Sequence, residues 1–247
     1  QNDNMPAYMV VQDPRGAPVN GAHTWGNGFL PAAYQGTLLR NQGTPILNLD
    51  LPRGLNRERQ RGELDQLRKF NKRFSQKYPD ATELEARIEA YELAYRMQTT
   101  APDLVDLSKE PEHIHKLYGL DNPQTEGFGR QCLMARRLAE SGVRYTMLIH
   151  GVQIGGNSWD HHGDVKGRMI RQSAEVDTPV AALLTDLQQR DMLQDTLVVW
   201  ASEMGRTPFV PGSIGGSPGR DHNKYGLVMW MAGGNVKPGV TIGGTDD

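Results

Sequence analysis

The strongest signal in this sequence is an alternation of apolar segments with amphipathic helices. The apolar segments lie at 143–149, 196–201 and 226–231. Helical periodicity fills the stretches 125–141 and 166–190, which precede the first two of them. Apolar strands separated by helices are typical of a sheet that helices cover on both faces. We therefore predict an α/β fold in which helices cover a sheet on both faces.

A second helical region precedes this alternation. Apolar residues recur at helical steps at Leu67, Phe70, Phe74, Leu84, Ile88, Tyr91 and Tyr95. Pro79 and Asp80 provide a break and a new start between the two halves of this pattern. The spacing predicts an antiparallel helix pair over 55–99, with its apolar stripe, tyrosines included, as the core of the pair.

The N-terminal part of the chain has a different composition. Residues 1–44 are rich in Gly, Pro and Asn, which favours turns and irregular backbone, and 45–50 can form one short strand. We accordingly divide the chain into three regions. These are a Gly/Pro-rich loop region with a short strand that is part of the core (1–52), a helical insert (53–123) and an α/β portion (124–247).

The charge of the chain is nearly balanced, with 27 basic against 29 acidic residues and a net charge of -2. This balance gives no global attraction to nucleic acid or anionic lipid, so any binding to polyanions must be local. Residues 53–77 hold nine Arg or Lys against three Asp or Glu. We interpret this excess as a solvated helix face rather than a nucleic-acid site, because no aromatic stacking set accompanies it.

Several classes of protein are excluded by composition. The single cysteine, Cys132, cannot form an internal disulfide or a thiolate zinc cluster, and its place on an apolar helical stripe predicts a packing role. No apolar run is long enough for a membrane span. The first residues lack a secretory signal. The chain begins without Met and ends on the hydrophilic residues TIGGTDD, so we expect it to be part of a longer polypeptide.

Polar residues gather at the ends of the predicted strands, where ligands bind in open α/β sheets. The first strand is followed by His150 and then by 157–164, the second by 202–208, and 219–224 precedes the third. Imidazole and carboxylate groups without sulfur are ligands that zinc or manganese accepts. A single Asp-His pair in a loop is more commonly a helix cap or a hydrogen-bonded pair than a set of metal ligands. The prediction of a metal site therefore depends on the fact that all three segments lie at strand ends.

Carboxylates for two neighbouring metals can come from Asp160, Glu203 and Asp221. Arg206 is left to neutralise an anionic substrate through its planar guanidinium. Three further residues are candidates either to bind the metal or to contact and orient its ligands: His150, His161 and Asp164.

At this point the motifs resemble a known bacterial family. They are LPAAYQGT, GTPILNL, ELEARIEAYELAYRMQ, SWDHHGD, TLVVWASEMGRTP and GRDHNKYG. Together they resemble the family called domain of unknown function 1501, which is similar to the sulfatases and is placed with the alkaline phosphatase superfamily. The resemblance covers essentially the whole chain, and the last three motifs are specific.

The resemblance implies a metal-dependent hydrolase core with a mixed, largely parallel sheet between helices and two metal positions at the carboxyl edge of that sheet. By the superfamily pattern, Asp160, His162 and His222 look like ligands of one metal, and Glu203 looks like a ligand of the other. Asp221 is a further candidate ligand, beside His222. His161 stands where the family often has Thr, and Arg206 follows the family pattern as the group that binds the substrate anion.

The resemblance also implies what this chain lacks. A first strand with a metal-binding Asp, the nucleophile and a closing His-containing helix are expected outside it, so the chain resembles a central to C-terminal fragment with part of a bimetal site. No Cys/Ser-x-Pro-x-Arg sulfatase signature occurs.

The expected function is hydrolysis of sulfate or phosphate esters, either small molecules or glycans, with a divalent metal: zinc first, manganese or calcium as alternatives. The alternative from another class is a non-catalytic metal-binding or interaction module of the same fold. Nucleic-acid binding through 53–77 ranks last. By resemblance alone the protein is expected in the periplasm or outside the cell, and the sequence leaves its oligomeric state open.

Overall fold

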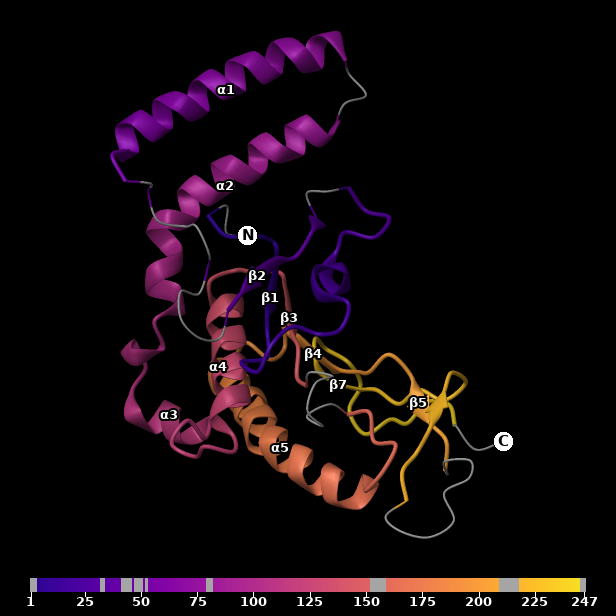
Figure 1. Cartoon of the computed structure of the whole chain (residues 1–247). Coiled ribbons are helices and arrows are strands. Elements are labelled where there is room, and N and C mark those ends of the chain that lie inside the picture. The colour runs from indigo at the N-terminus through magenta and orange to yellow at the C-terminus, as the bar shows by residue number, and fades with distance from the viewer. Residues whose placement is uncertain are drawn as a thin grey trace. The chain divides into compact units, whose positions relative to one another are not determined.

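The structure is a computed structural model of the 247-residue chain. It describes residues 4–31, 34–40, 46, 51, 53–78, 82–151, 159–208 and 218–244, without the side chains of 82–86. The chain forms two compact units. Unit 1 consists of 1–109 and 137–149, and unit 2 consists of 110–136 and 150–247. Figure 1 labels the five α-helices and most of the strands that the described residues of the two units form.

A parallel three-stranded sheet forms the centre of unit 1. Strand β1 (Tyr8–Val11) pairs in parallel with β2 (Thr37–Leu39) on one side and with β3 (Tyr145–Leu148) on the other. Met9 and Val10 in β1 are fully buried. A continuous apolar strand suits this central position, because the middle strand of a parallel sheet is covered on both faces.

The prediction of irregular backbone over residues 1–44 is wrong at β1 and β2. These strands have only four and three residues, so the surrounding Gly and Pro residues dominate the composition of the region. The remainder of this region includes the short 3-10 helix η1 (Gly21–Trp25). The strand predicted over 45–50 falls on residues that, apart from Ile46, lie outside the described part of the chain.

The predicted antiparallel helix pair is confirmed as α1 (Arg57–Lys77) and α2 (Thr82–Val105), which lie side by side in Figure 1. Helix α1 begins after Asn56, whose side chain accepts a hydrogen bond from the backbone N–H of Arg59 at 2.8 Å. Such an N-cap satisfies one of the backbone donors that a helix start leaves unpaired. The predicted break at Pro79 and Asp80 lies outside the described residues.

The predicted apolar core of this pair is wrong for most of its stripe. Leu67, Phe70 and Phe74 are 44%, 61% and 42% exposed, and Tyr91 is 45% exposed. Polar contacts instead join the two helices. Arg61 donates to both carboxylate oxygens of Glu92, at 2.7 and 2.5 Å. Tyr95 is half-buried, with the guanidinium groups of Arg57 and Arg61 over its ring at 4.8 and 5.2 Å.

The helices of unit 2 agree with the sequence pattern. They are α3 (Glu112–Leu117), α4 (Glu126–Glu140), whose last residues belong to unit 1, and α5 (Val165–Gln189). Pro179 lies inside α5 without ending it. Cys132 of α4 is buried, as predicted, and burial raises the pKa of its thiol, so it is a packing residue.

A buried ion network connects these helices. Arg136 of α4 lies 2.6 Å from Glu110 and 3.0 Å from Asp186 of α5. The hydroxyl of Tyr118, which follows α3, donates to Asp186 at 3.0 Å. Burial, followed by the charge of Asp186, raises the pKa of Tyr118, so this hydroxyl stays protonated and can donate.

The remaining strands form two small antiparallel pairs in unit 2. Strand β4 (Leu197–Trp200) pairs with β7 (Trp230–Gly233), and β5 (Gly205–Arg206) pairs with β6 (His222–Asn223). The three predicted strand segments are therefore not neighbours in one parallel sheet among the described residues. The α/β class is confirmed, with a small parallel sheet. Within the described part, no helix combines the length and the apolar character that a membrane span needs.

Candidate metal centre

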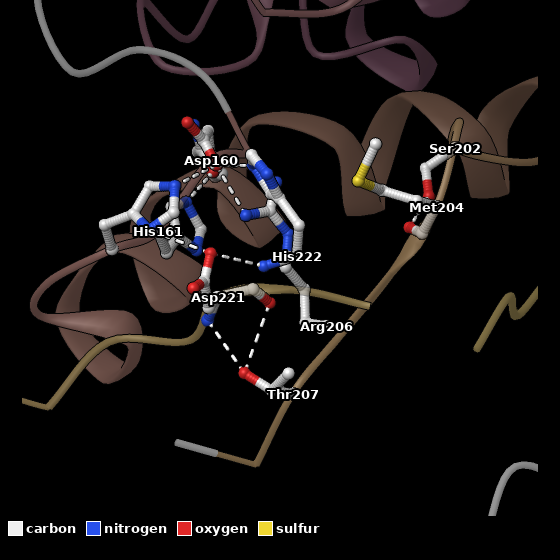
Figure 2. A network of polar contacts seen from close by, with 10 residues as sticks. Asp160, His161, Ser202, Met204, Arg206, Thr207, Asp221 and His222 are labelled. Atoms are coloured by element: carbon white, nitrogen blue, oxygen red, sulfur yellow. Dashed lines mark hydrogen bonds and ion pairs between the residues drawn. The ribbon is translucent and has the colours of Figure 1, made fainter. Parts of the chain in front are cut away.

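One carboxylate oxygen, Oδ1 of Asp160, is the centre of the candidate site. The Nε2 atoms of His162 and His222 each lie 3.0 Å from it, and Nη1 of Arg206 donates a hydrogen bond to it. Figure 2 shows the side chains of Arg206 and His222 directed toward Asp160. One ligand atom from each of Asp160, His162 and His222 can be chosen so that all three lie within 4.8 Å of one another.

The pairing of β5 with β6 explains why Arg206 and His222 meet. The two residues stand directly opposite each other in the antiparallel register. Opposite residues of such a pair project from the same face, so both side chains reach one carboxylate. The ladder continues beyond the strands, because Thr207 N donates to Asp221 O at 2.9 Å and Asp221 N donates to the Thr207 hydroxyl at 3.0 Å.

The loop that carries Asp160 and His162 is held against the segment before β6. Arg220 N donates to His161 O at 2.8 Å, and Val165 N donates to Pro218 O at 3.0 Å. Between these two hydrogen bonds, Gly219 lies so close to His162 that a Cβ atom there would overlap the His162 carbonyl group. The absence of a side chain at Gly219 therefore allows the two segments to approach.

The electrostatics of the site favour a charged Asp160. Its partial burial alone would raise the pKa of the carboxyl, but the hydrogen bonds from Arg206 and His222 outweigh this effect and lower the pKa below its ordinary value. The side chains of His162 and His222 are 45% and 51% exposed. An anionic oxygen and two imidazole rings thus face a region open to solvent.

The donor set fits a divalent metal by its chemistry. Two imidazole nitrogens and one carboxylate oxygen are a combination that zinc accepts, and a site with three protein ligands keeps a position for water or substrate. Manganese and calcium prefer more oxygen ligands, so the composition of this set favours zinc among the three metals.

Two other predicted ligands, Asp221 and Glu203, are not members of the group formed by Asp160, His162 and His222. Asp221 is beside the set: its Oδ1 accepts a hydrogen bond from His222 N at 2.7 Å and lies 3.8 Å from Nδ1 of His162. It can orient both histidines or join them as a ligand. Glu203 is exposed and is not part of the three-residue group that the described residues form.

Each of the three residues predicted either to bind the metal or to orient its ligands has a hydrogen-bond partner within the protein. His161 is buried, and its Nε2 lies 2.6 Å from Oε1 of Gln172. His150 has its Nε2 3.1 Å from Glu175. Asp164 is the N-cap of α5 and accepts a hydrogen bond from Gly167 N at 3.2 Å. His161 and His150 are therefore held against α5, and Asp164 caps the first turn of that helix.

Sequence reasoning missed the residues that hold these histidines. Gln172 and Glu175 lie one turn apart on α5 and contact His161 and His150 respectively. The indole N–H of Trp159 donates to Nδ1 of His150 at 3.0 Å. A signal was present in the sequence, because residues three apart share a helix face, yet nothing in the pattern indicates which loop they meet.

Comparisons with known proteins give one match. A family model described as "Protein of unknown function (DUF1501)" matches residues 1–247. The chain matches no curated protein and no solved structure.

Proposed function

The chain belongs to the DUF1501 family, and on this premise we propose that it carries a divalent-metal site of a hydrolase that cleaves sulfate or phosphate esters. The observation that supports the proposal is the convergence of Asp160, His162 and His222 beside Arg206. We also propose that the small parallel sheet and its helices belong to a sulfatase-like core of the alkaline phosphatase superfamily, on the resemblance of the motifs alone.

Asp160, His162 and His222 would hold the metal, with zinc as the preferred ion and manganese or calcium as alternatives. When bound, a divalent metal supplies Lewis-acid activation of an ester oxygen. Asp160 suits this role because its carboxyl is held in the charged form. The side chain of Asp221 accepts a hydrogen bond from the backbone N–H of His222 and so fixes the start of β6 beside the ligands.

Arg206 would bind the anionic part of the substrate. Its Nη1 donates to Asp160, and the planar guanidinium has further N–H groups whose spacing matches two oxygens of a sulfate or phosphate. Its side chain is 22% exposed, so solvent reaches it. The substrates that fit this pairing of metal and guanidinium are small-molecule or glycan esters, and we propose the periplasm or the extracellular space as the site of action, on resemblance alone.

A specific observation favours a second function, a non-catalytic metal-binding module. Among the described residues only one group of three metal-binding side chains forms, and Glu203 lies outside it. Hydrolases with paired metals need a second set of ligands. One structural or regulatory ion would be sufficient to explain why Asp160, His162 and His222 lie together.

The metal site is tested by titrating the metal-depleted chain with zinc, manganese and calcium in a calorimeter. We expect binding of at least one ion, and a loss of roughly 100-fold or more in affinity for Asp160→Ala and His222→Ala, because each removes a ligand. His113→Ala is the matched control, since this exposed histidine of α3 is not part of the three-residue group. Equal affinity in all three variants would refute the ligand assignment.

The activity is tested on a panel of sulfate and phosphate esters with the longest natural polypeptide that contains this chain. Hydrolysis only in the metal-loaded sample, with loss in Arg206→Ala, supports the hydrolase. Metal binding without hydrolysis of any ester supports the module instead.

A further inference from the structure

Residues 66–78, which are the second half of α1 and the residue that follows it, Tyr78, form an amphipathic segment whose apolar side chains face solvent. Leu67, Phe70, Phe74 and Tyr78 are 44%, 61%, 42% and 46% exposed. No side chain of α1, all of which the structure describes, is fully buried. At about 100° per residue, these four positions fall within roughly 80° of arc, so they form one strip along the helix.

Basic residues surround this strip. Residues 66–78 contain five Arg or Lys and no Asp or Glu. The five are Arg68, Lys69, Lys72, Arg73 and Lys77, and all are exposed. By helical spacing, Arg73 and Lys77 border the apolar strip, and the Lys77 ammonium lies 5.5 Å from the centre of the Tyr78 ring.

The positive charge is local to this segment. In the first half of α1, Arg59 pairs with Glu63, and Arg61 pairs with Asp65 and Glu92. Over 82–95, helix α2 contributes four Glu against one Arg. The excess of basic residues therefore lies in 66–78, which contains no acidic residue. Arg68 of this segment interacts with Glu92 of α2, whose pKa its charge lowers.

We propose that residues 66–78 dock on the surface of an anionic lipid bilayer, with the apolar strip at the level of the acyl-chain boundary. Helices that lie in this interface have Lys and Arg on the polar face, aromatic residues on the other, and low net hydrophobicity. Anionic headgroups attract basic residues within a Debye length of the surface. Both the sign of the charge and the exposed aromatic strip of this segment match such a surface.

Nucleic acid fits the same charge less well. Single-stranded nucleic acid needs aromatic rings along the groove that follows the phosphates, so that bases stack while phosphates meet cations. In residues 66–78 the aromatic rings form a strip along one side of the helix, and by helical spacing Lys69 and Lys72 lie on the opposite side. This separation suits a boundary between water and hydrocarbon.

The experiment is co-sedimentation of the full chain with phosphatidylcholine vesicles, with and without phosphatidylserine. We expect binding to the anionic vesicles only, and weaker binding as salt rises. Phe70→Ala/Phe74→Ala should lower the partition coefficient roughly tenfold or more, because two aromatic side chains no longer enter the interface. Lys69→Gln/Arg73→Gln should lower it by a similar factor.

Two variants serve as matched controls. Phe29→Ala removes an exposed aromatic ring outside the helix, and Lys166→Gln/Lys237→Gln removes two exposed charges from unit 2. Both should bind vesicles as the unaltered chain does. Circular dichroism checks that each variant keeps its helix content, which alanine at exposed helix positions favours.

Three results would overturn the proposal. They are the absence of binding to anionic vesicles, equal binding to vesicles without phosphatidylserine, and binding that depends on Lys69 and Arg73 but not on Phe70 and Phe74. A DNA duplex that competes fully with the vesicles, combined with the third result, would assign the segment to nucleic acid. Because none of the altered residues belongs to the candidate metal centre, the outcome is independent of the proposed hydrolase function.

Discussion

At the scale of single residues, Gly219 decides whether the loop around His162 can approach the strand that carries His222. A Cβ atom at Gly219 would overlap the backbone of His162, whereas one at Gly163 would meet nothing within 4 Å. We expect Gly219→Ala to lower the melting temperature and to weaken metal binding roughly tenfold or more, because the ligand loop must move. Calorimetric titration and thermal unfolding measure both effects.

Gly163→Ala is the control for this prediction. It makes the same change at the residue next to His162 without a steric conflict, so stability and metal affinity should stay close to those of the unaltered chain. Indistinguishable results for the two variants would show that the close approach at Gly219 is not required.

Arg206 and a metal ion would share the same carboxylate. The guanidinium donates to Oδ1 of Asp160, so a cation at this site meets both a competitor for that oxygen and a neighbouring positive charge. We expect Arg206→Gln to tighten zinc binding by roughly three- to tenfold, since both effects are removed. Titration calorimetry of the metal-depleted chain measures the change.

The control for Arg206→Gln is Arg220→Gln, which removes one exposed positive charge from the neighbouring segment. Its zinc affinity should change less than that of Arg206→Gln. Weaker zinc binding in Arg206→Gln would mean that the guanidinium mainly positions Asp160.

At the scale of elements, Asp186 connects the helices of unit 2. It pairs with Arg136 of α4, accepts from Tyr118 and pairs with Arg190 at 2.7 Å. Asp186→Ala should lower the free energy of unfolding by about 3–5 kcal/mol, because Arg136 stays buried with one of its anionic partners lost. Urea unfolding followed by circular dichroism gives this value.

The same substitution at an exposed position of α5, Asp177→Ala, is the control and should change the free energy of unfolding by about 0.5 kcal/mol or less. Similar values for the two variants would show that the ion network around Asp186 does not stabilise the folded state.

The contact between α1 and α2 predicts a pH dependence. The hydrogen bonds from Arg61 outweigh the effect of burial and lower the pKa of Glu92 below its ordinary value of 4.5. The ion pair therefore stabilises the folded state above pH 4.5, and this contribution is lost as the pH falls through the lowered pKa. Glu92→Gln should cost about 1 kcal/mol at neutral pH and almost nothing at strongly acidic pH.

Urea unfolding at a series of pH values measures this difference for Glu92→Gln and for Glu89→Gln, whose side chain is exposed. Only the first should show a difference that disappears on acidification. A cost for Glu92→Gln that is the same at every pH would mean that the ion pair contributes nothing.

The elements themselves differ in how well the sequence predicts them. The bounds of α4 and α5 agree with the periodic pattern to within a residue, because their signals are local. The third apolar segment is a strand only from Trp230 onward, since β7 pairs with β4 in a register that no local pattern specifies. The exposed aromatic strip of α1 was equally unpredictable, because periodicity shows that a face is apolar and does not show what covers it.

At the scale of the whole molecule, the chain passes from unit 1 to unit 2, returns once to unit 1 and then enters unit 2 again. Strand β1 lies between β2 and β3, and β3 comes from 137–149, far along the chain. A fragment of residues 1–109 should keep the helical signal of α1 and α2 and lose the slow amide exchange of residues 8–11, because a two-stranded remnant of a sheet is marginal in water. Amide exchange of the fragment and of the full chain, followed by NMR, measures both features, and persistent protection of residues 8–11 in the fragment would contradict this role of β3.

The helices, the α/β class and the segments from which the candidate ligands come can be predicted from the amino-acid sequence. Each of these depends on periodicity or on residue types within a short stretch, where neighbours in sequence are neighbours in space. The sequence does not indicate that Asp160 and His222, 62 positions apart, lie together while Glu203 lies outside their group, because this depends on tertiary contacts. Their meeting requires the pairing of β5 with β6 and the close approach at Gly219, and such long-range contacts are selected by the packing of the whole unit rather than by any local preference.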